Sequence, residues 1–164
     1  MIQRIYRGIL WLGVIAVAAM IFVFSAQDGA ASTSVSTVIV QAVIEVVDPD
    51  YGLRTMQEQQ DVFGFVEKLV RKAAHFTEYA ALGFFIRLLV GSYGLGRRTR
   101  VSWLIGTLYA CTDELHQLFI AQRAAMWQDV LLDSAGVLAG IVVAYTCTVL
   151  AQRWQDWKKR KSEG

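Results

Sequence analysis

The chain has 164 residues, of which 55% are hydrophobic and 18% charged, and its mean hydropathy is +0.39. This apolar share exceeds that of an ordinary soluble domain, and a single proline argues against a linker-rich or disordered chain. The formal net charge is only +2, a basic surplus too small to indicate a nucleic-acid partner, so we expect none. Length and composition together predict one all-α membrane domain over residues 1–164.

Four apolar segments follow one another along the chain. They cover residues 8–24, 73–93, 101–120 and 130–150. Each approaches the ~20 residues with which a helix crosses a hydrocarbon core of about 30 Å, so the sequence predicts a four-transmembrane-helix bundle. The alternative for the first segment is a signal peptide cleaved near Gly29-Ala30-Ala31. Its apolar run is longer than the usual signal core of ~7–15 residues, which favours a retained span.

The segment 25–72, between the first two spans, has a helical pattern of its own. Apolar residues recur at helical spacing up to Val47 and again from Val62 to Val70. The turn sequence Asp48-Pro49-Asp50-Tyr51-Gly52 separates the two stretches. We therefore expect two short amphipathic helices that lie on the outer leaflet or cover a site formed by the spans.

The basic residues indicate how the spans are oriented. One side of the predicted topology carries Arg4, Arg7, Arg97, Arg98, Arg100, Arg153, Lys158, Lys159, Arg160 and Lys161. The other side carries Arg54, Lys68, Arg71, Lys72 and Arg123. Because cytoplasmic loops hold the excess of Lys and Arg, we expect both termini in the cytoplasm and the segment 25–72 outside it.

This orientation brings polar residues from several segments to one depth near the outer face. The residues assigned to this site are Ser25, Gln27, Lys72, His75, Tyr79, Asp113, Glu114, Gln117, Arg123 and Asp129. Polar groups inside a membrane are costly and normally turn toward the bundle interior, so we expect them to share one site open to the outer leaflet. Within it, we expect Lys72 to lie within salt-bridge reach of Asp113, and Glu114 to meet Gln117.

The residue types suggest roles, each with a structural alternative. His75, Asp113 and Glu114 are the catalytic candidates, with His75 as a general base. The alternatives are a hydrogen-bonded core histidine and carboxylates that pair between helices. The other assigned residues are ligand-binding candidates. Among them, Lys72 and Arg123 suit an anionic head group, or simply anchor lipid phosphates at the interface.

Motifs for metals and cofactors are missing from the sequence. It contains no His-Glu-x-x-His pattern, phosphate loop, dinucleotide fingerprint or nucleophile elbow. We therefore expect no cofactor and no metal, with a divalent ion on His75, Asp113 and Glu114 as the alternative. Cys111 and Cys147 lie in apolar runs and are interpreted as buried thiols rather than a disulfide or metal pair.

The order of the polar motifs resembles that of the VanZ-like membrane proteins. The matching residues are Ser25 and Gln27, then Lys72, His75 and Tyr79, then Asp113, Glu114, Gln117 and Phe119, and finally Arg123, Asp129, Gly136 and Gly140. The chain departs from the pattern at Asp133, where an asparagine is expected in many members, and in the Ala-Ala-Met-Trp stretch after Arg123.

The resemblance implies a multi-pass protein of the bacterial inner membrane. The family is named for a teicoplanin-resistance factor, and some members accompany surface-polysaccharide machinery. Three functions follow as hypotheses: binding or remodelling of a lipid or lipid-linked glycan head group, a hydrolase or transferase acting on such a lipid, and a scaffold for envelope-biosynthesis proteins. The oligomeric state is left open by the sequence.

Overall fold

The computed structural model describes residues 1–26, 33–94, 98–120 and 126–163, and within these ranges it contains helices and no strand. This confirms the predicted all-α class. The elements are α1 (Ile2–Ser25), α2 (Thr33–Val47), the short 3-10 helix η1 (Tyr51–Leu53), α3 (Met56–Ser92), α4 (Arg98–Gln117) and α5 (Trp127–Glu163).

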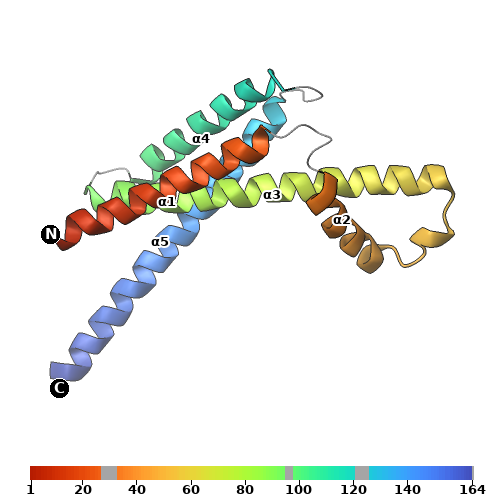
Figure 1. Ribbon diagram of the computed structural model, residues 1–164. Coiled ribbons are helices and arrows are strands. Elements are labelled where there is room, and N and C mark those ends of the chain that lie inside the picture. The colour runs from red at the N-terminus through yellow and green to blue at the C-terminus, as the bar shows by residue number, and fades with distance from the viewer. Residues whose placement is uncertain (27–32, 95–97, 121–125, 164) are drawn as a thin grey trace.

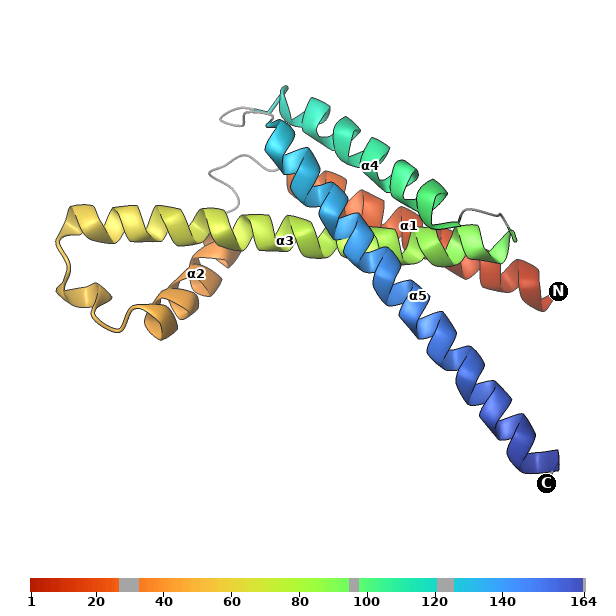
Figure 2. The ribbon, with the colours of Figure 1, turned by 180° about the vertical axis from the view of Figure 1, so that it is seen from behind.

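Helix α3 is the axis of the molecule. Helices α1 and α4 lie along its second half, α5 crosses it, and α2 folds back against its first half (Figures 1 and 2). The main core forms where α1, α3, α4 and α5 meet. Its buried members are Ile21, Tyr79, Leu82, Ile86, Val90, Ala110, Val137 and Ile141. The four from α3 recur every three or four residues, so a single side of that helix supplies half of this core.

Glycines allow α3 and α5 to cross in close contact. A Cβ atom added at Gly136 would lie 2.5 Å from the carbonyl oxygen of Phe76, and one at Gly140 would overlap the backbone of Ala80. A Cβ at Gly83 would likewise overlap the backbone of Val137. The Gly136-x-x-x-Gly140 spacing therefore serves helix packing, as expected for small residues at helix interfaces in membranes.

The first half of α3 corrects the prediction of two short outer helices. The first predicted helix exists as α2, which ends just before the Asp-Pro-Asp turn. The second is no separate helix, because α3 is continuous for 37 residues from Met56. Thr55 and Glu58 form a capping box that starts it, and no proline follows to interrupt it. At 1.5 Å per residue α3 is about 55 Å long, well beyond a hydrocarbon core.

A second, smaller core holds α2 against this extension of α3. Its buried residues are Val40, Ile44 and Val66, with Tyr51, Val62, Phe63 and Val70 packed around them. Arg54 and Asp48 close the turn between α2 and α3 with an ion pair of 2.7 Å. The part of the chain formed by α2, η1 and the first half of α3 is thus a helical hairpin with an interior of its own.

Three helices in the described ranges are long and apolar enough to cross a membrane, namely α1, α3 and α5. Helix α4 is not among them because it carries two arginines at its start and the polar cluster at its end, so the count of four spans stays a prediction. The interpretation of both cysteines as buried is wrong for Cys147, which is exposed on α5, while Cys111 is partly buried. An apolar run in a membrane protein turns part of its surface to lipid, so apolar neighbours do not imply burial inside the bundle.

Contacts at one end of the bundle bring the N-terminal helix to the end of α3. The Arg7 guanidinium donates a hydrogen bond of 2.7 Å to the Ser92 carbonyl and lies 4.2 Å over the ring centre of Tyr93. Both views place the N-terminus, the end of α3 and the C-terminus toward the same side of the molecule (Figures 1 and 2). The predicted site lies toward the opposite end of the bundle.

Candidate functional site

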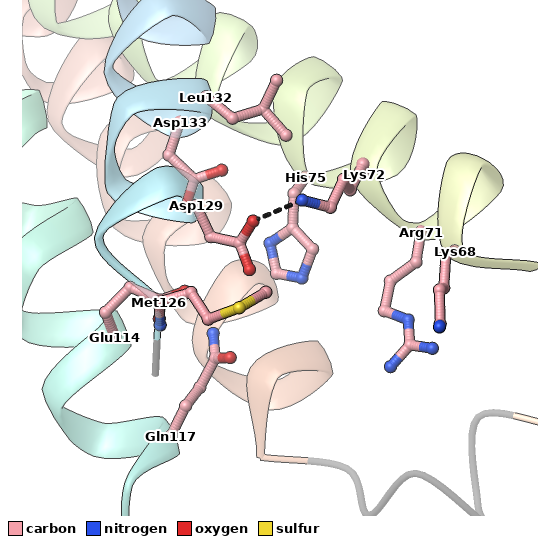
Figure 3. Close-up of a pocket in the computed structure, with 10 residues that line it drawn as sticks. All are labelled: Lys68, Arg71, Lys72, His75, Glu114, Gln117, Met126, Asp129, Leu132 and Asp133. Carbon is pink, nitrogen blue, oxygen red and sulfur yellow. Dashed lines mark hydrogen bonds and ion pairs between the residues drawn. The ribbon is translucent and has the colours of Figure 1, made fainter. Parts of the chain in front are cut away.

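A cavity of about 240 Å³ opens where α4 ends and α5 begins, next to the middle of α3. The residues around it are drawn in Figure 3. Its walls consist of Lys68, Arg71, Lys72, His75, Glu114, Gln117, Met126, Asp129, Leu132 and Asp133. Three helices thus contribute to one polar space, of which α3 supplies the cations and α4 and α5 the carboxylates.

The cations come from two adjacent turns of α3. Arg71 and Lys72 follow Lys68 by three and four residues, so both lie on the same side of the helix as Lys68. In Figure 3 the side chains of Lys68 and Arg71 extend from α3 on the same side as His75. Lys72 Nζ donates to Asp129 Oδ1 at 2.8 Å. For Lys68 and Arg71, no ion pair is found among the residues whose placement is described.

The Lys72 ion pair corrects one predicted contact. Its partner is Asp129 on α5 and not Asp113 on α4. With side-chain exposures of 46% and 27%, the pair lies at the cavity mouth, where water screens it. Asp129 is in the first turn of α5, so its charge also interacts favourably with the N-terminal end of that helix.

Asp113 lies behind the cavity, at the junction of α1 and α4. Ser25 Oγ donates to Asp113 Oδ2 at 2.8 Å, and Gln117 Nε2 donates to the same oxygen at 3.1 Å. All three side chains are less than a tenth exposed. Two donors therefore fix the orientation of this carboxylate and leave its other oxygen, Oδ1, without a hydrogen bond to any described residue.

Glu114 has a different partner from the predicted one. Its Oε2 accepts a hydrogen bond of 3.0 Å from the backbone N–H of Met126, just before α5 begins. Gln117, the expected partner, donates to Asp113 instead. Glu114 thus links the end of α4 to the start of α5, which favours the structural alternative for this residue.

The structure divides the assigned residues into two layers. Lys72, His75, Glu114, Gln117 and Asp129 line the cavity. Ser25, Tyr79 and Asp113 are buried beside it and outside its lining. Gln27 and Arg123 lie outside the described residues. The nearby His116 packs its ring against Phe22, with ring centres 4.6 Å apart.

Asp133 belongs to the site, although the sequence-based set leaves it out. Its side chain lines the cavity and is only 1% exposed. The available signal was its spacing of four residues from Asp129, which places both carboxylates on one side of α5. Lys68 and Arg71 are likewise on the wall, one turn before the predicted residues.

Fold and site together define a helical, membrane-compatible protein with a polar cavity at one end of its bundle. A family model for VanZ/LLP1 matches residues 10–150, so the chain belongs to the VanZ/LLP1 family. This confirms the resemblance seen in the polar motifs. No curated protein and no solved structure matches the chain.

Proposed function

We propose that this protein crosses the bacterial inner membrane four times, with both termini in the cytoplasm, and that its cavity binds the phosphate-bearing head group of a lipid in the outer leaflet. The observation that carries the proposal is the cavity itself. Three cations of α3 line it, and it lies at the end of the bundle opposite both termini.

The surface of α4 supports counting this helix as a span, in addition to α1, α3 and α5. Its polar residues Asp113, Glu114 and Gln117 are buried against the other helices. The side chains that α4 leaves exposed include Leu104, Ile105, Leu108 and Leu115. Beyond its polar start (Arg98, Thr99 and Arg100) and Thr112, the surface that α4 offers to lipid is therefore apolar, and the carboxylates near its end face the protein. Polar residues that face the bundle interior are the usual arrangement within membranes.

The charges of the cavity select the ligand class. Lys68 and Arg71 supply donors suited to phosphate, Lys as a point charge and Arg as a planar fork that bonds two oxygens. Their acidic neighbours, including Asp129, favour hydroxyl or amine groups beside that phosphate. A volume of about 240 Å³ lies below the usual range of small-molecule pockets, which favours a single compact head group, with its chains left in the membrane.

Cell-envelope metabolism, including tolerance of glycopeptides such as teicoplanin, is the setting we infer for this binding. A hydrolase or transferase acting on the same lipid remains the second candidate, because His75 lines the cavity beside the cations. The scaffold hypothesis is less well supported, since helix packing alone does not require three cations at one cavity.

Binding is tested with detergent-purified protein equilibrated with phosphatidylglycerol and analysed by native mass spectrometry. The double variant Lys68→Gln and Arg71→Gln removes both positive charges and leaves an unbranched, polar side chain at each position. We expect the bound lipid to fall at least about tenfold, because hydrogen bonds to charged groups contribute about 1.5–3 kcal/mol each and part of this is screened at an open cavity.

The matched control is the double variant Arg153→Gln and Lys158→Gln, which removes the same charge from the exposed end of α5. We expect this control to bind lipid like the unaltered protein. Equal retention in all three proteins, or an equal loss in both double variants, would contradict binding at the cavity. Unaltered binding accompanied by lost turnover of the lipid in a His75→Gln variant would favour the enzyme.

A further inference from the structure

Three helices bring potential metal ligands together beneath the cavity. His75 of α3, Asp113 of α4 and Asp133 of α5 each offer a ligand atom, and these three atoms lie within 4.8 Å of one another. His75 and Asp133 line the cavity, whereas Asp113 lies behind them. The cluster is distinct from the cations proposed to hold the lipid phosphate.

The two carboxylates are buried in a way that calls for a positive charge. Asp113 is 4% exposed and Asp133 is 1% exposed. Each has one oxygen, Oδ1, that is shielded from solvent and accepts no hydrogen bond from the described part of the chain. Neither forms an ion pair there, because the nearby Lys72 is engaged by Asp129. A buried carboxylate that stays ionised is normally paired with a cation or coordinates a metal.

We propose that His75, Asp113 and Asp133 bind one divalent first-row transition-metal cation, such as Mn²⁺ or Zn²⁺. An imidazole nitrogen suits Zn²⁺ and its neighbours in the series, while carboxylate oxygens suit Mn²⁺. A set of one nitrogen and two oxygens lies between these preferences. Mg²⁺ and Ca²⁺ fit less well, because both prefer ligands that are all oxygen.

The spacing of the three atoms is compatible with coordination after a small side-chain adjustment. For atoms 4.8 Å apart, a common point lies about 2.8 Å from each (the separation divided by √3), compared with metal–ligand distances of about 2.0–2.2 Å for His and Asp. Movements below about 1 Å therefore complete the site.

The neighbours of Asp113 have the arrangement of an outer coordination shell. Ser25 and Gln117 both donate to Oδ2, which directs Oδ1 away from them. Hydrogen bonds of this kind orient the ligands of metal sites and tune their affinity. Ser25 is in α1, so a bound ion would connect all four helices of the main bundle. Because His75 and Asp133 line the cavity, the ion would also be accessible from it.

The inference goes beyond the proposed function, and metal binding is tested without added lipid. Detergent-purified protein is stripped with a chelator and exposed to Mn²⁺ or Zn²⁺. One portion is desalted and analysed for metal content, and a second portion is unfolded thermally with the metal still present. We expect about one ion per chain, and a rise in Tm of about 5–10 °C at a hundredfold excess of metal over Kd. Less than about a tenth of an ion per chain with no shift in Tm would overturn the proposal.

Variants identify the ligands. We expect Ser25→Ala, which removes only an orienting hydrogen bond, to weaken binding by about 10–100-fold, and Asp133→Asn and His75→Gln each to weaken it by more than Ser25→Ala does. Asp61→Asn, on the exposed start of α3, is the control and should bind like the unaltered protein. Equal affinity in the Asp133→Asn protein and the control would place the ion elsewhere and overturn the assignment.

The lipid and metal proposals fail separately. The protein with Lys68→Gln and Arg71→Gln keeps all three proposed metal ligands, so it should lose lipid and retain the ion. If that variant loses the ion as well while its helical content and Tm before metal addition are unaltered, the ion is bound at the cavity mouth and not beneath it.

Discussion

Replacing Gly140 by alanine tests the crossing of α3 and α5. The added Cβ would lie 2.7 Å from the Ala80 carbonyl carbon and 2.8 Å from the Phe84 nitrogen, and these backbone atoms cannot rotate away. Alanine is favoured over glycine within a helix by about 1 kcal/mol, whereas overpacking costs about 1–3 kcal/mol or more. Because the obstacle is backbone, we take the upper part of that range and expect a net loss of about 1–2 kcal/mol.

Gly64 provides a matched control within α3. A Cβ added there has no atom within 4 Å, so only the helix preference remains and Gly64→Ala should raise stability by up to about 1 kcal/mol. Reversible unfolding of the two variants in mixed micelles, followed by circular dichroism, measures the difference. If Gly140→Ala were as stabilising as Gly64→Ala, the close contact between α3 and α5 would be refuted.

Three further predictions concern the site and the topology. Ser25→Ala removes a donor from the buried Asp113 carboxylate and should lower the free energy of unfolding by about 1.5–3 kcal/mol. The control Ser162→Ala, at an exposed position, should change it by less than about 0.5 kcal/mol. Equal effects of the two variants would argue against the buried contact. Lys72→Met breaks a partly exposed ion pair and should lower the free energy of unfolding by less than about 1 kcal/mol. A loss above about 2 kcal/mol would show that the pair is more strongly desolvated than its exposure indicates. In protein whose two cysteines are replaced by serine, a membrane-impermeant maleimide should label Pro49→Cys from outside the cell and leave Arg100→Cys unlabelled, and labelling of both would refute the four-span topology.

The features that sequence could predict are those set by local spacing. The repeat of apolar residues located the helices, and the turn around Pro49 correctly ended α2. The Gly136–Gly140 spacing is a local pattern of the same kind, because residues four apart lie on the same side of a helix, and both glycines lie in the close crossing with α3. The same rule gathered Lys72 and His75 on one side of α3, where both line the cavity.

The features that sequence missed depend on how helices cross. Lys72 pairs with Asp129 because α5 begins beside the middle of α3, and no periodicity within one helix contains that information. The length of α3 was missed for another reason. The charged stretch around Lys68–Lys72 interrupts the hydropathy and looks like a boundary, although the capping residues Thr55 and Glu58 already marked the true start.

The continuous helix α3 joins two interiors of very different size, and this gives the molecule two levels of cooperativity. The hairpin of α2 and early α3 encloses Val40, Ile44 and Val66, whereas the bundle encloses a core of eight residues. Opening of the hairpin leaves the bundle's contacts in place, so backbone amides of α2 exchange with deuterium through a local event. Amides deep in the second half of α3 exchange only when the bundle itself opens. The amides of α3 therefore report both the opening of the hairpin and the opening of the bundle. Their exchange pattern changes where the smaller core ends, near Val70.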